Sequence, residues 1–140
     1  LFTLALCGSD AAPAVSRLLT IFRDENVSYD IRACAAITLG RIGSAAKAAI
    51  SDLCTALKDD TEASEVRKCA AIALGGLWPA SKSKLSLMIQ YLDDEDWDIS
   101  EGAVKAVGII GPDANTYLPI IVDLMNDPNA DRDVRRAAVV

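Results

Sequence analysis

Hydrophobic residues recur along this chain with the spacing of helices rather than strands. Apolar positions are separated by three or four residues, as at Val15, Leu18 and Phe22, which is the period of an amphipathic helix. No segment sustains the alternation of apolar and polar residues that a half-buried strand requires. The pattern predicts helices over 11–23, 30–42, 46–58, 65–77, 82–93, 98–110, 114–126 and from 133 onward.

The helical pattern repeats itself about every 35 residues. The segment DIRACAAITLGRIG, which begins at Asp30, returns as EVRKCAAIALGGLW at Glu65. Each unit therefore holds two helices: helix A, which carries this segment, and helix B, which follows it. One pair cannot bury its apolar face, whereas stacked pairs form a continuous core. The aligned core positions at the start of successive A helices are Ile31, Val66, Ile99 and Val134.

This repetition predicts one all-α array over residues 1–140, a right-handed solenoid of stacked antiparallel helix pairs. Its units are expected at about 1–28, 29–63, 64–96 and 97–131, with the start of another at 132–140. The chain begins and ends within the pattern, so we expect it to be part of a longer protein. Helix A carries a glycine at Gly40, Gly75 and Gly108, although a mid-helix glycine costs about 1 kcal/mol against alanine. We expect these glycines to admit a close approach of helix B.

The charge balance limits the partners that the chain can bind. It has 20 acidic and 14 basic residues, which gives a net charge of −6. Nucleic-acid backbones are bound by clustered Lys and Arg, so this balance disfavours a nucleic-acid partner. A protein partner with a basic segment is more compatible, because most carboxylates lie in the turns that lead into helix A. The basic residues expected near the opposite edge are Arg41, Lys47, Lys82 and Lys84.

Membrane, metal and catalytic sites find little support. No apolar run approaches the roughly 18–20 residues of a membrane span. The chain contains no His, and the run DDEDWD lacks both the Gly and the bidentate Glu of a calcium-binding loop. No nucleophile elbow or phosphate-binding glycine loop is present. We therefore predict no metal, no cofactor, no catalytic residue and no enzymatic activity.

The cysteines are expected to serve as small core residues. None forms a CxxC pair, and each falls on an apolar helical position, where cysteine packs as a small hydrophobe. Free cysteines of this kind favour a reducing, cytoplasmic location. The four are Cys7, Cys34, Cys54 and Cys69.

The recurring pattern "VR..AA..LG..G", followed by helix B and an acidic turn, resembles HEAT repeats. It is most similar to the short HEAT-like subtype of phycobilisome lyases and bacterial HEAT scaffolds. The resemblance implies an armadillo-like helical fold and a scaffold that binds another protein. Two other functions remain open: a bilin lyase-like subunit for chromophore attachment, and a nucleic-acid-binding HEAT-like module, for which the basic residues are few. The oligomeric state is left open.

The resemblance also implies a polar ladder between neighbouring units. In HEAT-like repeats an acid and an Arg at the start of helix A commonly join one unit to the next, so we expect Asp30 to reach Arg67. Ser100 replaces the Arg in the fourth unit, where we expect a looser or differently bonded junction. The predicted ladder consists of Asp30, Arg32, Glu65, Arg67, Asp98, Asp133 and Arg135.

The exposed face of helix B is the predicted partner-binding surface, because the resemblance implies that B helices line the concave face. Leu87 and Ile120 occupy a non-core column of successive units, where an apolar pair suggests an anchor for a partner. The alternative is lateral packing between helices. The predicted partner-binding residues are Asp52, Thr55, Leu87, Gln90, Ile120 and Asp123.

Overall fold

The computed structural model describes residues 12–129 and 132, and its regular elements over that part of the chain are all helical. The A helices are α2, α4 and α6, and the B helices are α1, α3, α5 and α7. The α-helices are α1 (Ala12–Arg23), α2 (Tyr29–Ile42), α3 (Ile50–Lys58), α4 (Ser64–Gly76), α5 (Leu85–Gln90), α6 (Trp97–Ile110) and α7 (Leu118–Asn126). The 3-10 helices are η3 (Gly43–Ala49), η4 (Lys82–Lys84) and η5 (Gly111–Tyr117). The helix expected from residue 133 lies outside the described residues.

The A helices begin and end within one residue of their predicted bounds, whereas α3, α5 and α7 begin later than predicted. Each of these three B helices is preceded by a 3-10 segment, a common form of an α-helical N-terminus. Gly43 and Gly111 turn the chain between the two helices, with φ values of 79° and 73° that favour glycine. Ala46 then interrupts η3 with φ −98° and ψ 18°. The α5 helix is the shortest, because a turn follows Gln90.

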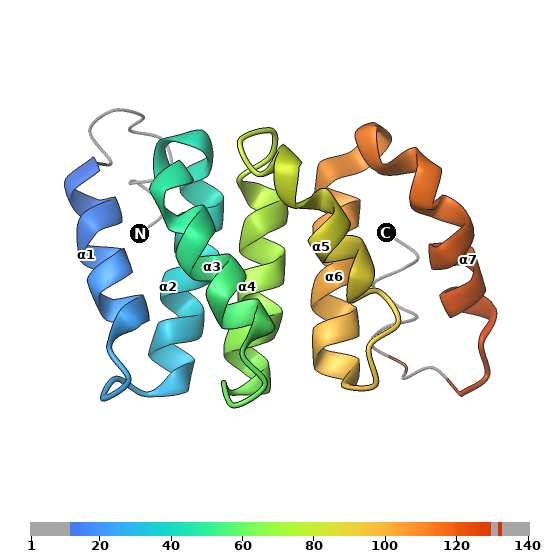
Figure 1. Cartoon of the computed structure of the whole chain (residues 1–140), viewed down its shortest axis with the longest axis horizontal. Coiled ribbons are helices and arrows are strands. Elements are labelled where there is room, and N and C mark those ends of the chain that lie inside the picture. Colours follow the sequence, from blue (N-terminus) through green and yellow to red (C-terminus); the bar gives the residue numbers. More distant parts are fainter. Residues whose placement is uncertain (1–11, 130–131, 133–140) are drawn as a thin grey trace.

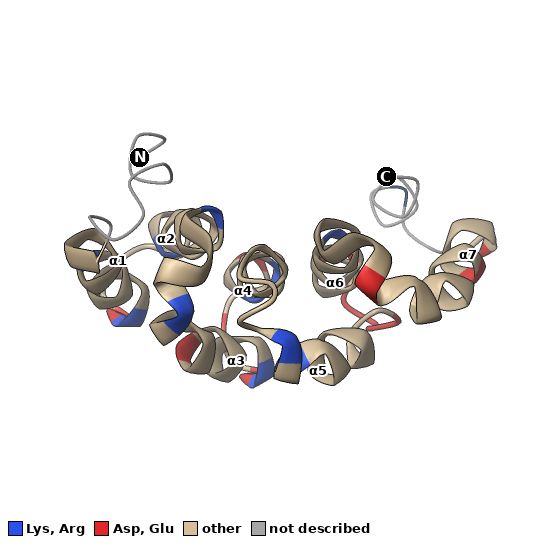
Figure 2. Cartoon of the chain, turned by 90° about the horizontal axis from the view of Figure 1, so that it is seen from above, with Lys and Arg blue, Asp and Glu red and all other residues tan. Residues whose placement is uncertain are grey.

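The helices form two curved layers (Figures 1 and 2). Figure 2 shows α2, α4 and α6 on the inner side of the curve and α1, α3, α5 and α7 on its outer side. We call these layers the inner row and the outer row. The expectation that B helices line the concave face is therefore wrong, because the A helices line it. The right-handed sense of the array stays a prediction.

The curvature follows from close contacts within the inner row. A Cβ atom added at Gly40 would lie 2.7 Å from Ala73 Cα, and one added at Gly75 would lie 2.7 Å from Ala106 Cα. The glycines thus let neighbouring A helices meet backbone to backbone, and the predicted approach of helix B is wrong. Because the inner row packs this closely, the array curves with the inner row on its concave side, as Figure 2 shows.

The core lies between the two rows. Leu39 and Leu74 of the inner row and Leu53, Leu57 and Met88 of the outer row are fully buried. Burying one such side chain stabilises the fold by about 1.5–3 kcal/mol. The aligned core positions Val66 and Ile99 are likewise fully buried.

Near the ends of the array the core prediction fails. Ile31, an aligned core position, is 55% exposed, and Leu118 and Met125, apolar residues of α7, are 48% and 37% exposed. Helix α4 lies between two described A helices, whereas α2 and α7 each have a described neighbour on one side of their row only. A repeat position is therefore buried only where a neighbouring unit covers it.

Candidate partner-binding surface

Arg32, Arg67 and Ser100 form a column that joins each A helix to the preceding B helix. Arg32 Nε donates to the carbonyl oxygen of Phe22 at 3.0 Å, and Arg67 Nε donates to that of Leu57, also at 3.0 Å. Ser100 Oγ donates at 2.5 Å to the carbonyl oxygen of Leu92, the next residue in that aligned column. The serine therefore replaces the arginine in satisfying a backbone carbonyl, which here lies in the turn after α5, so this junction is differently bonded, as expected.

The carboxylates that pair with these arginines are not the predicted ones. Arg32 makes a bidentate pair with Glu62, at 2.5 and 3.0 Å, and Arg67 Nη2 lies 3.3 Å from Asp60 Oδ1. The expected pairing of Asp30 with Arg67 is wrong, because both arginines pair with acids of the turn before α4. For Arg67 this turn precedes its own helix, and for Arg32 it belongs to the next unit.

The other acids of the predicted ladder have different surroundings. Cys69 Sγ donates to Glu65 Oε1 at 3.8 Å, and Asp98 accepts no arginine within the described residues. Asp133 and Arg135 lie outside the residues that the structure describes. The ladder is therefore a set of arginine-to-carbonyl and arginine-to-turn bonds.

A charged cluster that the sequence reasoning missed joins α4 to α6. Glu101 is 7% exposed and pairs with Lys68 at 2.6 Å and with Lys105 at 2.8 Å. Burial raises the pKa of Glu101, but the hydrogen bonds from Lys105 and Lys68 outweigh it, so its pKa is lowered. Burial lowers the pKa of Lys68, and the bond to Glu101 reverses this, so its pKa is raised. The i, i+4 spacing of Glu101 and Lys105 signals their pair, whereas the contact with Lys68 depends on the stacking of units.

Two predicted partner-binding residues are engaged within the outer row. Asp52 accepts a hydrogen bond from Arg23 Nη2 at 2.6 Å, which links α1 to α3 on an exposed surface. Thr55 donates its hydroxyl hydrogen to the Ser51 carbonyl oxygen of its own helix at 3.0 Å. These two residues lie on the predicted face, but other groups of the chain already occupy their polar atoms.

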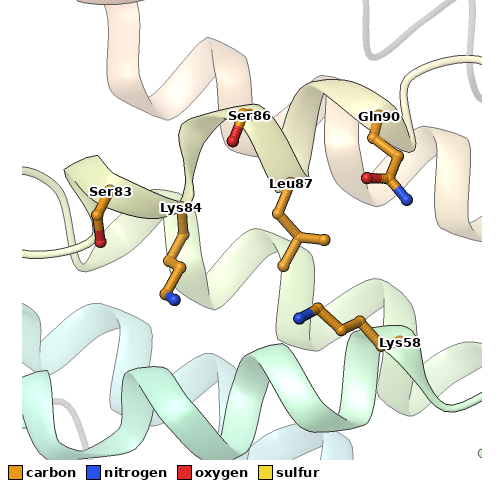
Figure 3. A pocket seen from close by; sticks show the side chains of 6 residues that line it. All are labelled: Lys58, Ser83, Lys84, Ser86, Leu87 and Gln90. Atoms are coloured by element: carbon orange, nitrogen blue, oxygen red, sulfur yellow. The ribbon is translucent and has the colours of Figure 1, made fainter.

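Leu87 and Gln90 line an open cleft of about 380 Å³ between α3 and the segment from η4 to α5 (Figure 3). Leu87 is half-buried and packs against the core, as the alternative of lateral packing predicted. Part of its side chain also lines the cleft. In Figure 3 the side chain of Lys84 extends into the space between the helices beside Leu87, and the side chain of Lys58 extends from α3 with its ammonium end facing Leu87. The residues that line the cleft are Lys58, Ser83, Lys84, Ser86, Leu87 and Gln90.

Ile120 and Asp123 belong to a second, smaller cleft of about 170 Å³. It lies between the turn after α5 and helix α7, one repeat further along the outer row. Ile120 is 38% exposed there. The residues that line this second cleft are Asp93, Ile120, Asp123, Leu124 and Asp127. The structure thus divides the predicted partner surface into two clefts of opposite charge.

The convergence of Lys58 and Lys84 was not predicted. Lys58 ends α3 and Lys84 ends η4, so they occupy different positions of the repeat. Lys84 was expected near the edge opposite the acidic turns. The long side chains of the two lysines extend from these positions into one cleft. An alignment of repeats compares equivalent positions only, so it does not predict that these two residues share a cleft.

The cysteines of the described residues differ in their surroundings, and all three are free thiols. Burial, as the largest cause, raises the pKa of Cys69 to about 12 and also raises the pKa of Cys54. These thiols stay protonated at neutral pH, consistent with small core residues. Cys34 is exposed, so its predicted core position is wrong. Cys7 lies outside the described residues.

The described residues contain no group of three or more His, Cys, Asp or Glu side chains that could hold a metal ion. The stretch Tyr29–Lys58 is long and apolar enough for a membrane span by composition. It is folded as α2, η3 and α3, with a reversal at Gly43. The two α-helices have 14 and 9 residues, and each is shorter than the roughly 20 residues that cross a bilayer.

Comparison with known proteins agrees with this architecture. A family model described as HEAT repeats matches residues 1–75 and 61–140. Comparison with curated protein sequences gives no match. Among solved structures, the chain is similar to the complex of CpcE and CpcF of phycocyanin lyase from Nostoc sp. PCC7120, with 25% identity and a TM-score of 0.69. The match covers 99% of this chain and 84% of that chain. With its stacked helix pairs and a family match over its whole length, the chain belongs to the HEAT repeat family.

Proposed function

We propose that this chain is a HEAT-repeat scaffold that binds a protein partner along its outer row. The observation that carries the proposal is the pair of open clefts between α3, α5 and α7, in which Leu87 and Ile120 lie among polar side chains. Protein interfaces commonly combine an apolar anchor with a polar rim. The scaffold proposal assigns no catalytic step to the residues of this chain.

The similarity to the CpcE–CpcF complex supports a protein partner, because that structure contains two proteins bound to each other. The outer row also offers what the inner row lacks, namely gaps between neighbouring helices. The inner helices meet at Gly40 and Gly75 with backbone contacts, which leave no room for a partner side chain between them. A partner that inserts side chains between helices therefore binds the outer row.

The test is affinity capture with the intact chain and matched aspartate variants. Leu87→Asp and Ile120→Asp place a charge in the two clefts, and Ile109→Asp places one on a more exposed aliphatic residue of α6, where Ile109 is 53% exposed. We expect the cleft variants to lower capture of the partner at least about 10-fold, since a charge at a buried anchor costs 1.4 kcal/mol or more. The Ile109 variant should retain capture.

Thermal unfolding of each variant shows whether the array is intact, which matters most for Leu87 because it also contacts the core. Ile120→Asp provides the independent reading, because the Ile120 side chain is more exposed and Ile120 lies in the other cleft. Full capture by both folded cleft variants, or loss of capture by the Ile109 variant alone, would contradict binding on the outer row.

A second candidate function is that of a lyase-type subunit that supports chromophore attachment to another protein. The similarity to the phycocyanin lyase complex over nearly the whole chain favours it. Because the thiols of Cys54 and Cys69 are buried and protonated, this chain would act by holding the acceptor protein and not through either of these thiols as a nucleophile. The purified chain, alone and with phycocyanin, is mixed with a bilin, and a shifted absorbance band is expected. An unchanged spectrum in both mixtures argues against this function.

A further inference from the structure

The cleft between α3 and α5 carries a positive charge on a chain whose net charge is −6. Its lining contains Lys58 and Lys84 and no acidic residue. The two lysine side chains share the cleft with Leu87, and the remaining lining residues are Ser83, Ser86 and Gln90, which supply hydrogen-bonding groups. The local charge is therefore opposite to the charge of the chain as a whole.

The acids near this cleft in the sequence are occupied elsewhere. Asp59 accepts hydrogen bonds from the backbone and hydroxyl of Thr61, at 2.9 and 2.6 Å. Asp60 pairs with Arg67. Within the described residues, neither Lys58 nor Lys84 forms an ion pair with these carboxylates. Both lysines therefore present unneutralised charge to the cleft.

The buried thiol of Cys54 lies near the same two lysines. Burial raises its pKa, while the charges of Lys84 and Lys58 both act to lower it. The two lysines, from different repeats, therefore border both Cys54 and the cleft that contains Leu87.

We propose that this cleft binds an acidic segment of the partner protein, in which carboxylate side chains flank an apolar residue. The carboxylates pair with Lys58 and Lys84, and the apolar side chain covers Leu87. This inference rests on the proposed function, since it names the chemistry of the partner segment at one of its two clefts. A small anion alone would satisfy the lysines but leave Leu87 uncovered, so the shape and polarity of the cleft fit a peptide segment better.

The neighbouring cleft restricts where such a segment binds. It carries Asp93, Asp123 and Asp127 around Ile120, so it repels carboxylates. An acidic segment is therefore directed to the α3–α5 cleft and excluded from the one beside it. The basic partner segment expected from net charge does not fit the cleft that contains Leu87, because the charge there is locally reversed.

The experiment measures fluorescence anisotropy of a labelled synthetic 11-residue peptide with the intact chain. The probe carries glutamates on both sides of a central leucine, and the comparison peptide carries lysines in their place. We expect the glutamate peptide to bind at least about 10-fold more tightly and its binding to weaken as NaCl is raised from 50 to 300 mM, which shortens the Debye length about 2.5-fold. The Lys58→Glu and Lys84→Glu variants should each weaken it about 10-fold.

Lys47→Glu is the matched control, because it makes the same change of charge at an exposed residue of η3 outside the cleft. It should change the affinity less than two-fold. Equal binding of the two peptides, no change in anisotropy up to about 1 mM chain, or equal loss in all three variants would overturn the proposal. Full displacement of the peptide by millimolar inorganic phosphate would also overturn it, since it would indicate an anion site without apolar recognition.

The same variants separate this inference from the proposed function. If Leu87→Asp lowers capture of the partner and Lys58→Glu with Lys84→Glu leaves capture unchanged, the outer row binds the partner and the acidic segment is wrong. If Leu87→Asp and Ile120→Asp both leave capture unchanged in folded protein, the scaffold proposal itself fails. Circular dichroism of each lysine variant confirms that its helices are intact.

Discussion

Replacing Gly75 by alanine tests whether backbone contact in the inner row determines the packing of the repeats. The added Cβ would lie 2.7 Å from Ala106 Cα and 2.8 Å from Ala106 O, so helix α4 and helix α6 must move apart. In an isolated helix the same change is favourable by about 1 kcal/mol. Overpacking a core typically costs about 1–3 kcal/mol, and contact with backbone is at the upper end because backbone cannot rotate away.

The net expectation for Gly75→Ala is a loss of about 2 kcal/mol in the free energy of unfolding. Urea denaturation followed by circular dichroism measures this loss as a lower midpoint concentration of urea. The dependence of the free energy of unfolding on urea concentration shows whether the repeats still unfold together. Gly108→Ala is the matched control, because no atom of the described residues lies within 4 Å of a Cβ at Gly108. It should be neutral or stabilise by up to about 1 kcal/mol. A Gly75 variant as stable as the original chain would refute the close contact of the inner helices.

Three further results are expected. Glu101→Gln should lower the free energy of unfolding by roughly 1–3 kcal/mol at pH 7, because Lys68 loses a buried charged partner. Since the folded-state pKa of Glu101 is lowered, the stability from this carboxylate is present above its unfolded pKa and is lost as pH falls through the folded value. The difference between the two proteins should therefore shrink below about pH 4.5, as measured by denaturation at several pH values. Ser100→Ala should destabilise by about 1–2 kcal/mol in thermal unfolding, because the Leu92 carbonyl in the turn after α5 loses its buried donor; an unchanged Tm would contradict this role of Ser100. In a Cys7→Ser background, iodoacetamide should alkylate Cys34 in the folded protein and Cys69 only after unfolding, as read by peptide mass spectrometry; early modification of Cys69 would contradict its burial.

The column of Arg32, Arg67 and Ser100 illustrates how repeats tolerate variation. All three side chains donate to the carbonyl of the same aligned position, which lies in the last turn of α1 and of α3 but in the turn after α5. The arginines additionally reach an acid of the turn, whereas the serine does not extend that far. At the junction that lacks this arginine, Lys68 and Glu101 provide an ion pair between α4 and α6. The charge that joins neighbouring units has therefore moved to another position of the repeat.

The sequence by itself determined the helices, their pairing and the repeat. The spacing of Val15, Leu18 and Phe22 is a local property, since it depends only on the 3.6-residue period of one helix, and all three residues are buried as expected. The A-helix bounds agreed within one residue for the same reason. The resemblance to HEAT repeats followed from residues that recur in register, and the family match confirms it.

Only the tertiary structure decided which row lies inside the curve, which acids pair with the arginines, and which lysines face each other. Curvature depends on the difference in spacing between two layers, and that difference arises from contacts such as Gly75 against Ala106, which are far apart in sequence. The pairing of Arg32 with Glu62 and the convergence of Lys58 and Lys84 depend on where long, flexible side chains extend across a junction. Periodicity records which face of a helix is apolar, whereas these features depend on the distance and orientation of helices from neighbouring repeats.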